Sequence, residues 1–213
     1  MRDVYHEELD SIGRTLIEMT GLVGTAMGRA TTALLEADLQ VAESVISADD
    51  AVDALQRELD ARSLDLLARQ QPVAGDLRTI ITSLRMSADI ERMGDLARHV
   101  AKVARLRYPD VAVPVDLRDT IGRMGRIAVD LATKTAEIIE GRDVAVAREL
   151  PVDDDAMDDL HRALFGALLD KRAEYSTEMA IDVTLIGRYY ERFADHAVSV
   201  SKRIIFLVTG EPH

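Results

Sequence analysis

Apolar side chains recur every three or four residues along most of the chain, which is the periodicity of an amphipathic α-helix. Between Tyr5 and Glu36, for example, the spacing is kept by Leu9, Ile12, Leu16, Met19 and Val23. Prolines and glycines interrupt the pattern and divide the chain into helical stretches. We expect six helices, over about residues 5–36, 47–70, 76–107, 116–140, 153–173 and 178–208.

Capping residues predict two points at which helical structure begins after the first helix. Asp38 is expected to cap only a short helical turn, and Ser47 with Asp50 has the spacing of a capping box that opens the second long helix. Pro151 is expected to lie in a turn that follows Asp143 and precedes the fifth helix.

The first helix is rich in glycine, with residues at Gly13, Gly21, Gly24 and Gly28. Each glycine lowers helix propensity, so their number needs a reason. We expect neighbouring helices to approach closely at these positions, and the alternative is a frayed or bent helix.

The second half of the chain repeats the first. Residues 91–97 (Glu-Arg-Met-Gly-Asp-Leu-Ala) recur at 191–197 (Glu-Arg-Phe-Ala-Asp-His-Ala), and residues 49–55 recur at 154–160. Asp38 corresponds to Asp143 in the same alignment. Because short connections make consecutive helices antiparallel neighbours, we predict an all-α fold of two tandem three-helix bundles related by internal duplication. The first bundle is expected to span residues 1–108 and the second 109–213, divided at the segment between Pro109 and Pro114.

The composition supports helices and removes several kinds of chemistry. Of 213 residues, 47% are hydrophobic and only 4% aromatic, which favours a helical globular protein over a β-sheet protein. Because the chain has no cysteine, it contains no disulfide, thiolate zinc site, iron–sulfur cluster or cysteine nucleophile.

The net charge of −12 argues against nucleic acid as a partner, because an acidic surface repels phosphate backbones. The longest apolar runs, such as residues 204–208, are too short to cross a bilayer, so we expect no direct membrane insertion. The N-terminus carries acids where a signal peptide would have a basic start and an apolar block. We therefore expect a cytoplasmic protein.

Acidic residues spaced four apart recur in both repeats, so that each pair shares one helix face. Counting from the expected tip of the first hairpin, between Val73 and Ala74, places Asp53 level with Asp95 on the facing helix. Carboxylates held together repel one another unless they are neutralised, and oxygen-only sites suit hard cations such as magnesium, calcium, manganese or iron. The candidate metal ligands, which we expect at the surface, are Asp49, Asp53, Glu91, Asp95, Asp154, Asp158, Glu191 and Asp195.

The alternative is a solvated acidic face whose charges are balanced by surface ion pairs from Arg57, Arg92, Arg162 and Arg192. His99 lies four residues after Asp95 and is a possible additional ligand or simply a solvated side chain. The sequence has no Glu-x-x-His motif of a ferritin-like di-iron enzyme, no Walker loop, no dinucleotide-binding turn and no nucleophile elbow. We therefore predict no catalytic residues and no organic cofactor, only divalent or iron cations at the carboxylates.

The duplicated Glu-Arg-x-x-Asp segments at residues 90–97 and 190–197, together with residues 67–78, resemble the PhoU family of accessory regulators of the phosphate-specific Pst transporter. The resemblance covers essentially the whole chain. It implies a cytoplasmic homodimer of helical bundles that represses the phosphate-starvation response at high phosphate. It also implies contacts with the ATPase subunit of the Pst transporter and with the sensor histidine kinase of the phosphate regulon, and metal binding at the eight carboxylates.

On this basis we expect a non-enzymatic adaptor that relays the state of the transporter to the kinase. Two alternatives use the same residues differently. The carboxylates belong to a metal store or metalloenzyme in the first, and they only keep a helical scaffold soluble in the second.

Overall fold

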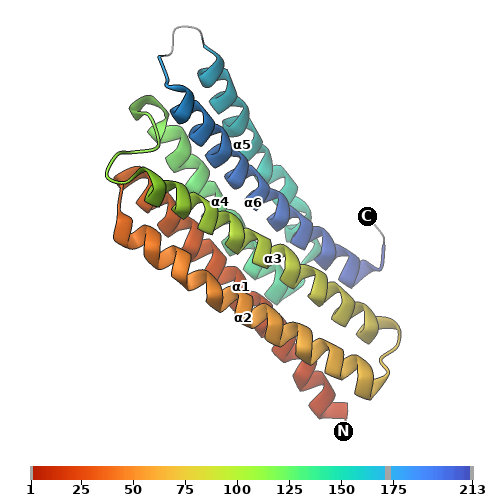
Figure 1. Cartoon of the computed structure of the whole chain (residues 1–213). Helices are drawn as coiled ribbons and strands as arrows, with labels where there is room; N and C mark the ends of the chain where they lie inside the picture. Colours follow the sequence, from red (N-terminus) through yellow and green to blue (C-terminus); the bar gives the residue numbers. More distant parts are fainter. Residues whose placement is uncertain (1, 171–173, 212–213) are drawn as a thin grey trace.

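The computed structural model describes residues 2–170 and 174–211, and these form six long α-helices with no β-strand. In order, the helices are α1 (Arg2–Glu36), α2 (Leu39–Gln70), α3 (Ala74–Arg107), the short 3₁₀ helix η1 (Val115–Leu117), α4 (Arg118–Gly141), α5 (Val144–Leu169) and α6 (Thr177–Thr209). The expected all-α fold is confirmed (Figure 1).

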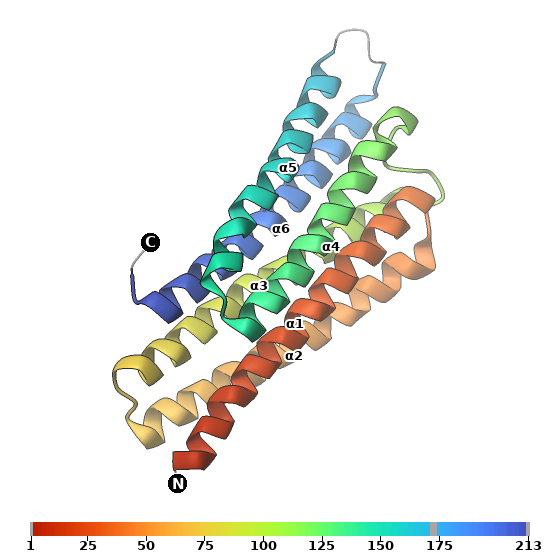
Figure 2. The same cartoon turned by 180° about the vertical axis from the view of Figure 1, so that it is seen from behind.

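The helices form two layers along one long direction. Helices α2, α3, α6 and α5 lie side by side in that order in one layer, and α1 and α4 cover the other side (Figures 1 and 2). Within this arrangement α1–α3 form one three-helix bundle and α4–α6 form the other, as predicted. The bundles pack side by side through α1 against α4 and α3 against α6.

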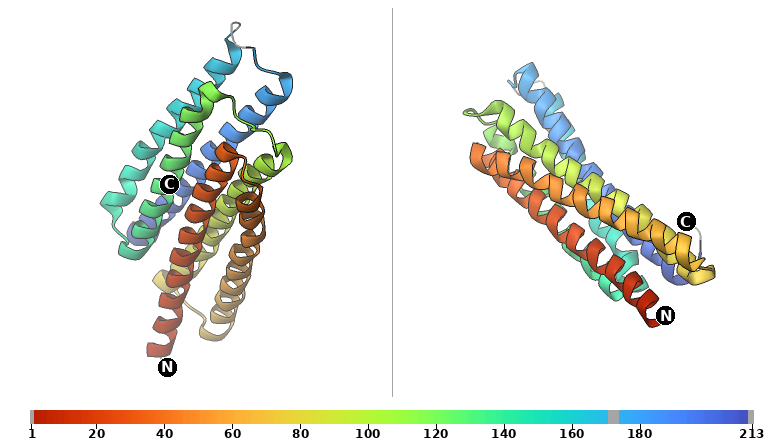
Figure 3. Two further views of the ribbon diagram at one scale, coloured as in Figure 1. Left: turned by 90° about the vertical axis from the view of Figure 1, so that its left-hand side faces the viewer. Right: turned by 60° about the horizontal axis from the view of Figure 1, so that its bottom comes forward.

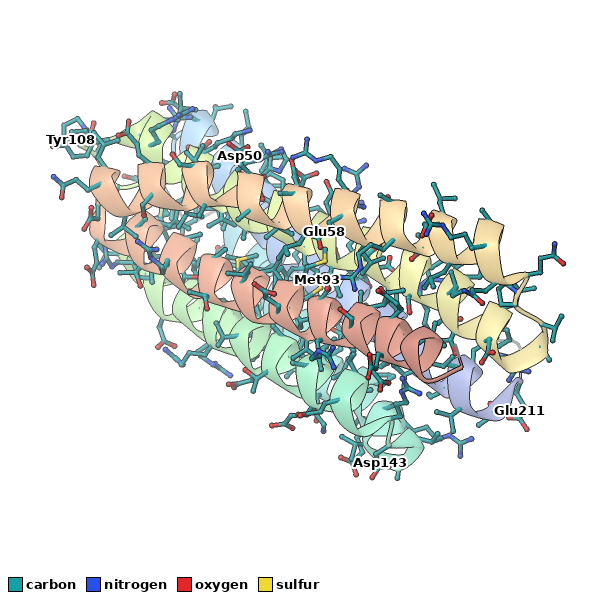
Figure 4. The ribbon with its side chains drawn as sticks, turned by 90° about the horizontal axis from the view of Figure 1, so that it is seen from below. Asp50, Glu58, Met93, Tyr108, Asp143 and Glu211 are labelled. Carbon is teal, nitrogen blue, oxygen red and sulfur yellow. The ribbon has the colours of Figure 1, made fainter. Side chains whose placement is uncertain are left out.

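The two bundles share one apolar core. Buried side chains from every long helix belong to a single cluster, in which Met93, Tyr190 and Phe193 have no exposed surface. Figure 4 shows Met93 among the helices, with Tyr108 at one end of the molecule and Asp143 and Glu211 at the other. One core runs through both halves, so core packing does not test where one domain ends and the next begins. The division of the chain between residues 108 and 109 stays a prediction.

Polar contacts also join the two bundles. The buried hydroxyls of Thr31 in α1 and Tyr190 in α6 lie 2.7 Å apart and form a hydrogen bond. At the α3–α6 contact, the carboxylate of Asp89 accepts a hydrogen bond of 2.6 Å from Nε of Arg203 and faces Nδ1 of His196 at 3.1 Å. Farther along the same contact, Arg107 at the end of α3 pairs with Asp182 and Glu178 of α6.

The predicted start of α2 is wrong. The helix begins at Leu39, where the side chain of Asp38 accepts a hydrogen bond of 2.9 Å from the backbone N–H of Val41. Ser47 lies inside the helix, and its hydroxyl donates to the carbonyl of Glu43. The apparent capping box is therefore mid-helix, because nothing after Asp38 breaks the helix.

The predicted turn at Pro151 is also wrong. Helix α5 begins at Val144, with Asp143 as its N-cap, and continues through Pro151. Proline removes one N–H donor, but the surrounding helix and its packing on α4 and α6 hold the segment helical. The helix ends at Leu169, and residues 171–173 of the expected helix lie outside the described part of the chain. The predicted correspondence of Asp38 with Asp143 is confirmed, since both side chains cap helices.

The glycines of α1 have two different roles. A Cβ atom on Gly24 would lie 2.9 Å from Cβ of Ala132, and one on Gly28 would lie 3.2 Å from Val129 in α4. These two positions therefore allow α1 and α4 to approach closely, as expected. Gly13 and Gly21 face open space, so close packing does not explain them.

The two hairpin tips point in opposite directions. The α2–α3 turn lies at the same end of the molecule as the C-terminal end of α6, while the end of α5 and the start of α6 lie at the far end (Figures 1 and 3). The guanidinium of Arg78 in α3 lies over the ring of Phe206, 5.6 Å from its centroid. Helices α3 and α6 therefore pack antiparallel to each other.

Candidate carboxylate clusters

The first hairpin brings its four candidate ligands together. Asp49 and Asp53 of α2 lie near Glu91 and Asp95 of α3, close enough that the other three carboxylates raise the pKa of Glu91 in addition to burial. We call these four residues the α2–α3 cluster. Three of them are half-buried, but Asp49 is only 6% exposed, so the expectation that all the acids lie at the surface is wrong for this residue.

The register of the facing acids differs from the prediction. Oδ1 of Asp49 lies 3.1 Å from where a Cβ atom of Gly94 would be, which places Asp49, and not Asp53, level with Asp95. The α2–α3 connection comprises residues 71–73, so the hairpin tip lies closer to α2 than expected. The glycine at position 94 leaves the room into which the Asp49 carboxylate fits.

Two arginines partly neutralise the α2–α3 cluster. Nη1 of Arg98 lies 2.5 Å from Oδ2 of Asp49, and Nη2 of the same side chain pairs with Asp95. Arg92, predicted from the sequence, contacts Asp95 at 2.9 Å. Arg57 instead donates to the backbone carbonyl of Asp53, so its predicted ion pair is absent from the described contacts.

Sequence reasoning missed Arg98. The prediction relied on positions that the two repeats share, and the residue equivalent to Arg98 in the second repeat is Val198. A helix-spacing argument would have found it, since residues three apart on a helix are neighbours and Arg98 follows Asp95 by three. Burial raises the pKa of Asp49 above its ordinary value, and Arg98 opposes this rise only in part.

The second hairpin also gathers its four acids, which we call the α5–α6 cluster: Asp154 and Asp158 of α5 with Glu191 and Asp195 of α6. Asp154 and Glu191 are half-buried, and Asp158 and Asp195 are exposed. Arg188 pairs with Glu191, but no ion pair among the described residues involves the other three carboxylates. The predicted Arg162 contacts Asp159 at 2.6 Å instead.

Charge repulsion in the α5–α6 cluster is large. Burial, followed by the charges of Asp158, Asp195 and Glu191, raises the pKa of Asp154 to about 7. A carboxyl group with this pKa is half-protonated at neutral pH, so a proton or a cation is needed to relieve the repulsion.

Within the described residues, no three Asp, Glu or His side chains are already placed to hold one metal ion. Cation binding would therefore require these side chains to change rotamer. The imidazole of His99 is engaged elsewhere, since its Nδ1 lies 2.6 Å from the backbone oxygen of Asp95 and its ring packs on Tyr189. His161 packs on Phe165, and its buried Nε2 has no hydrogen-bond partner in the part of the chain that the structure describes.

The substitution Asp154→Asn is expected to stabilise the metal-free protein at pH 8 by about 1–2 kcal/mol, a value reduced for partial solvent screening. In the wild type, the Asp154 carboxyl binds a proton more tightly in the folded state than in the unfolded state, in which its pKa is 3.8. Asp154 therefore lowers the stability of the fold progressively as the pH rises from about 4 to about 7. Urea unfolding with a chelator at pH 8 and pH 5 measures the effect, and the gain should shrink at pH 5. An equal gain in stability at both pH values would contradict the raised pKa of Asp154.

No helix among the described residues combines the length and the apolar character needed to span a membrane. The protein is all-helical and duplicated, and each repeat contributes one helical hairpin with a carboxylate cluster. Fold and site thus define a class of tandem helical-bundle proteins with a pair of carboxylate clusters.

Comparison with known proteins identifies the family. The PhoU domain model matches residues 16–104 and again residues 121–204, so the chain belongs to the PhoU family and carries its domain twice. The predicted resemblance and the internal duplication are both confirmed.

The similarity to individual relatives extends over nearly the whole of this chain. The phosphate-specific transport system accessory protein PhoU homolog 2 of Mycobacterium tuberculosis is 49% identical over 210 residues, covering 99% of each chain. PhoU homolog 1 of Mycobacterium leprae is 47% identical, covering 99% of this chain and 95% of its own. The crystal structure of PhoU from Pseudomonas aeruginosa superposes with a TM-score of 0.84 at 27% identity, covering 97% of this chain and 100% of that one.

Proposed function

We propose that this protein is a regulator of phosphate uptake and of the phosphate-starvation response. The observation that carries the proposal is the 49% identity to a phosphate-specific transport system accessory protein over 99% of both chains. An identity this high over the full length preserves both bundles and both hairpins, so a shared role follows more directly than it would from the fold alone.

The mechanism we propose is that of a non-enzymatic adaptor in the cytoplasm. Its partners are the ATPase subunit of the Pst transporter, the sensor histidine kinase of the phosphate regulon and a second copy of the chain. At high phosphate the adaptor represses the starvation response. The long two-layer shape supports this role, because it presents a broad surface of four adjacent helices to partners (Figure 1).

The acidic clusters suit this role in two ways. Exposed carboxylates attract basic surfaces on partner proteins and speed their association. The α5–α6 cluster is in addition the better candidate for a cation, because Asp154, Asp158 and Asp195 lack an ion-pair partner among the described residues. Magnesium, calcium, manganese or iron are the cations that such oxygen ligands favour.

A capture experiment tests the adaptor. Tagged protein expressed in its own host at high and low phosphate should retain the transporter ATPase and the kinase, and loss of the gene should leave the starvation response active at high phosphate. Reversing two exposed acids of the α5–α6 cluster, Asp158→Lys with Asp195→Lys, should weaken capture at least about tenfold. The matched control, Asp130→Lys with Glu137→Lys, makes the same charge change on the exposed surface of α4 and should leave capture intact.

Two outcomes would contradict the proposal. Recovery of neither partner at either phosphate level, with a normal starvation response in the deleted strain, would remove the adaptor role. Turnover of a substrate by the metal-loaded protein would instead support the second candidate, a metalloenzyme built on the same carboxylates.

A further inference from the structure

We propose that Arg98 is a permanent internal cation of the α2–α3 cluster, so that the two halves of this duplicated protein differ in their need for metal. In the first half, this guanidinium supplies part of the neutralising charge and occupies the place of a cation between α2 and α3. Any cation bound by the protein then belongs to the α5–α6 cluster. This inference rests on the proposed cation binding and specifies which half carries it.

The position of Arg98 supports this role. Its two terminal nitrogens contact carboxylates from two different helices, Asp49 of α2 and Asp95 of α3. A planar guanidinium can bridge two carboxylates in this way because its donors form a fixed fork. Bridging facing acids across a helical hairpin is also what a bound divalent ion would do, so the guanidinium takes the place of that ion.

An ordinary surface ion pair does not account for the geometry. The side chain of Asp49 is only 5% exposed, and that of Arg98 is 27% exposed. Nε of Arg98 and Oδ2 of Asp49 are both buried without a hydrogen-bond partner among the described residues, so charge attraction at 2.5 Å, and not a hydrogen bond, holds the two groups together. Removing one member of such a pair leaves a buried charge uncompensated, which is strongly unfavourable.

The equivalent position of the second half has no charge. Around it the repeats agree, with glutamate, arginine, aspartate and alanine at equivalent positions, but Val198 stands where the first half has Arg98. Val198 is 8% exposed and packs into the shared core. The α2–α3 cluster therefore does not fit the metal site expected from the resemblance, whereas Asp154, Asp158 and Asp195 of the α5–α6 cluster have no ion-pair partner among the described residues.

A reciprocal exchange between the repeats tests the inference. The wild type, Arg98→Val and Val198→Arg are compared by thermal unfolding with EDTA and with millimolar Mn²⁺, and by calorimetric titration with Mn²⁺. The wild type should bind no more than one ion per chain. Arg98→Val should unfold at a lower temperature than the wild type in EDTA, should recover that loss in Mn²⁺, and should gain a second ion. Val198→Arg should weaken Mn²⁺ binding at least about tenfold.

Matched controls separate these effects from general changes in charge. Arg105→Val removes an exposed arginine from α3, and Val208→Arg adds one to an exposed position of α6. Neither should change the number of bound ions.

The outcomes distinguish this inference from the proposed function. If Arg98→Val lost no stability in EDTA and gained no Mn²⁺ site, the role of Arg98 would be refuted. If the wild type bound no metal while Arg98→Val lost stability and recovered it in Mn²⁺, cation binding at the α5–α6 cluster would fail and the role of Arg98 would stand.

Discussion

Gly125→Ala should lower the free energy of unfolding by about 1–3 kcal/mol, the range found for overpacked cores. The added Cβ would lie 2.5 Å from Cγ2, 2.6 Å from Oγ1 and 3.0 Å from Cβ of Thr31. Rotating the threonine moves the first two atoms but not its Cβ, so α1 and α4 must separate. The hydrogen bond between Thr31 and Tyr190 would be strained by the same movement. Urea unfolding measures the loss.

The matched control is Gly166→Ala in α5, where an added Cβ meets no atom within 4 Å. This change should raise stability by about 0.5–1 kcal/mol, because alanine favours the helix over glycine. Thr31→Ala in the Gly125→Ala background should return part of the loss, since it removes the two closest atoms. Equal effects of the two glycine substitutions would show that helix propensity, and not the contact of α1 with α4, decides the result.

Asp89→Ala is expected to cost about 2–3 kcal/mol, less than the 3–5 kcal/mol typical of a fully buried pair, because the contact is only partly shielded from water. The side chain of Asp89 is 13% exposed and holds Arg203 and His196 at the contact between α3 and α6. Without it, the guanidinium of Arg203 and the imidazole of His196 remain at the interface with no carboxylate between them. Asp130→Ala, at an exposed position of α4, should change stability by less than about 0.5 kcal/mol.

The cost of Asp89→Ala should depend on pH. Burial raises the pKa of Asp89, but hydrogen bonds from His196 and Arg203 outweigh it and leave the pKa below its ordinary value. A carboxylate of this kind stabilises the fold above the ordinary aspartate pKa and loses that effect as pH falls through the folded-state value. The difference between wild type and variant, measured by urea unfolding, should therefore be full above about pH 5 and shrink as the pH falls below about 4. A constant difference would show that packing, and not charge, is lost.

Local sequence patterns predicted the ends of a helix well where no residue inside it resembled a helix boundary. The 3.6-residue rhythm placed α1, α3, α4 and α6 within a few residues of their observed ends. The starts of α2 and α5 were missed because Ser47 and Pro151 have the local chemistry of helix boundaries, while packing on neighbouring helices carries the helix through both. Propensity at one residue is a weaker effect than the burial of a whole helix face.

Periodicity and duplication predicted that the acids of each hairpin lie together. They did not predict how buried each acid is or which side chains surround it. Burial of Asp49 depends on the room beside Gly94 and on the register set by a three-residue connection, and neither is visible along one helix. A close approach of neighbouring helices was predicted at four glycines of α1, and the structure shows it at Gly24 and Gly28, where α4 is the neighbour. The tighter contact at Gly125 depends on which α1 side chain it meets.

The pairing of α1 with α4 and of α3 with α6 joins equivalent helices of the two repeats in antiparallel fashion. Each repeat thus covers its apolar surface with a copy of itself, which is the arrangement of a twofold-symmetric dimer. A repeat produced alone would expose these surfaces and should self-associate through the same two helix pairs. Because the two repeats are covalently joined, their association does not require identical copies, and one carries Arg98 where the other carries Val198.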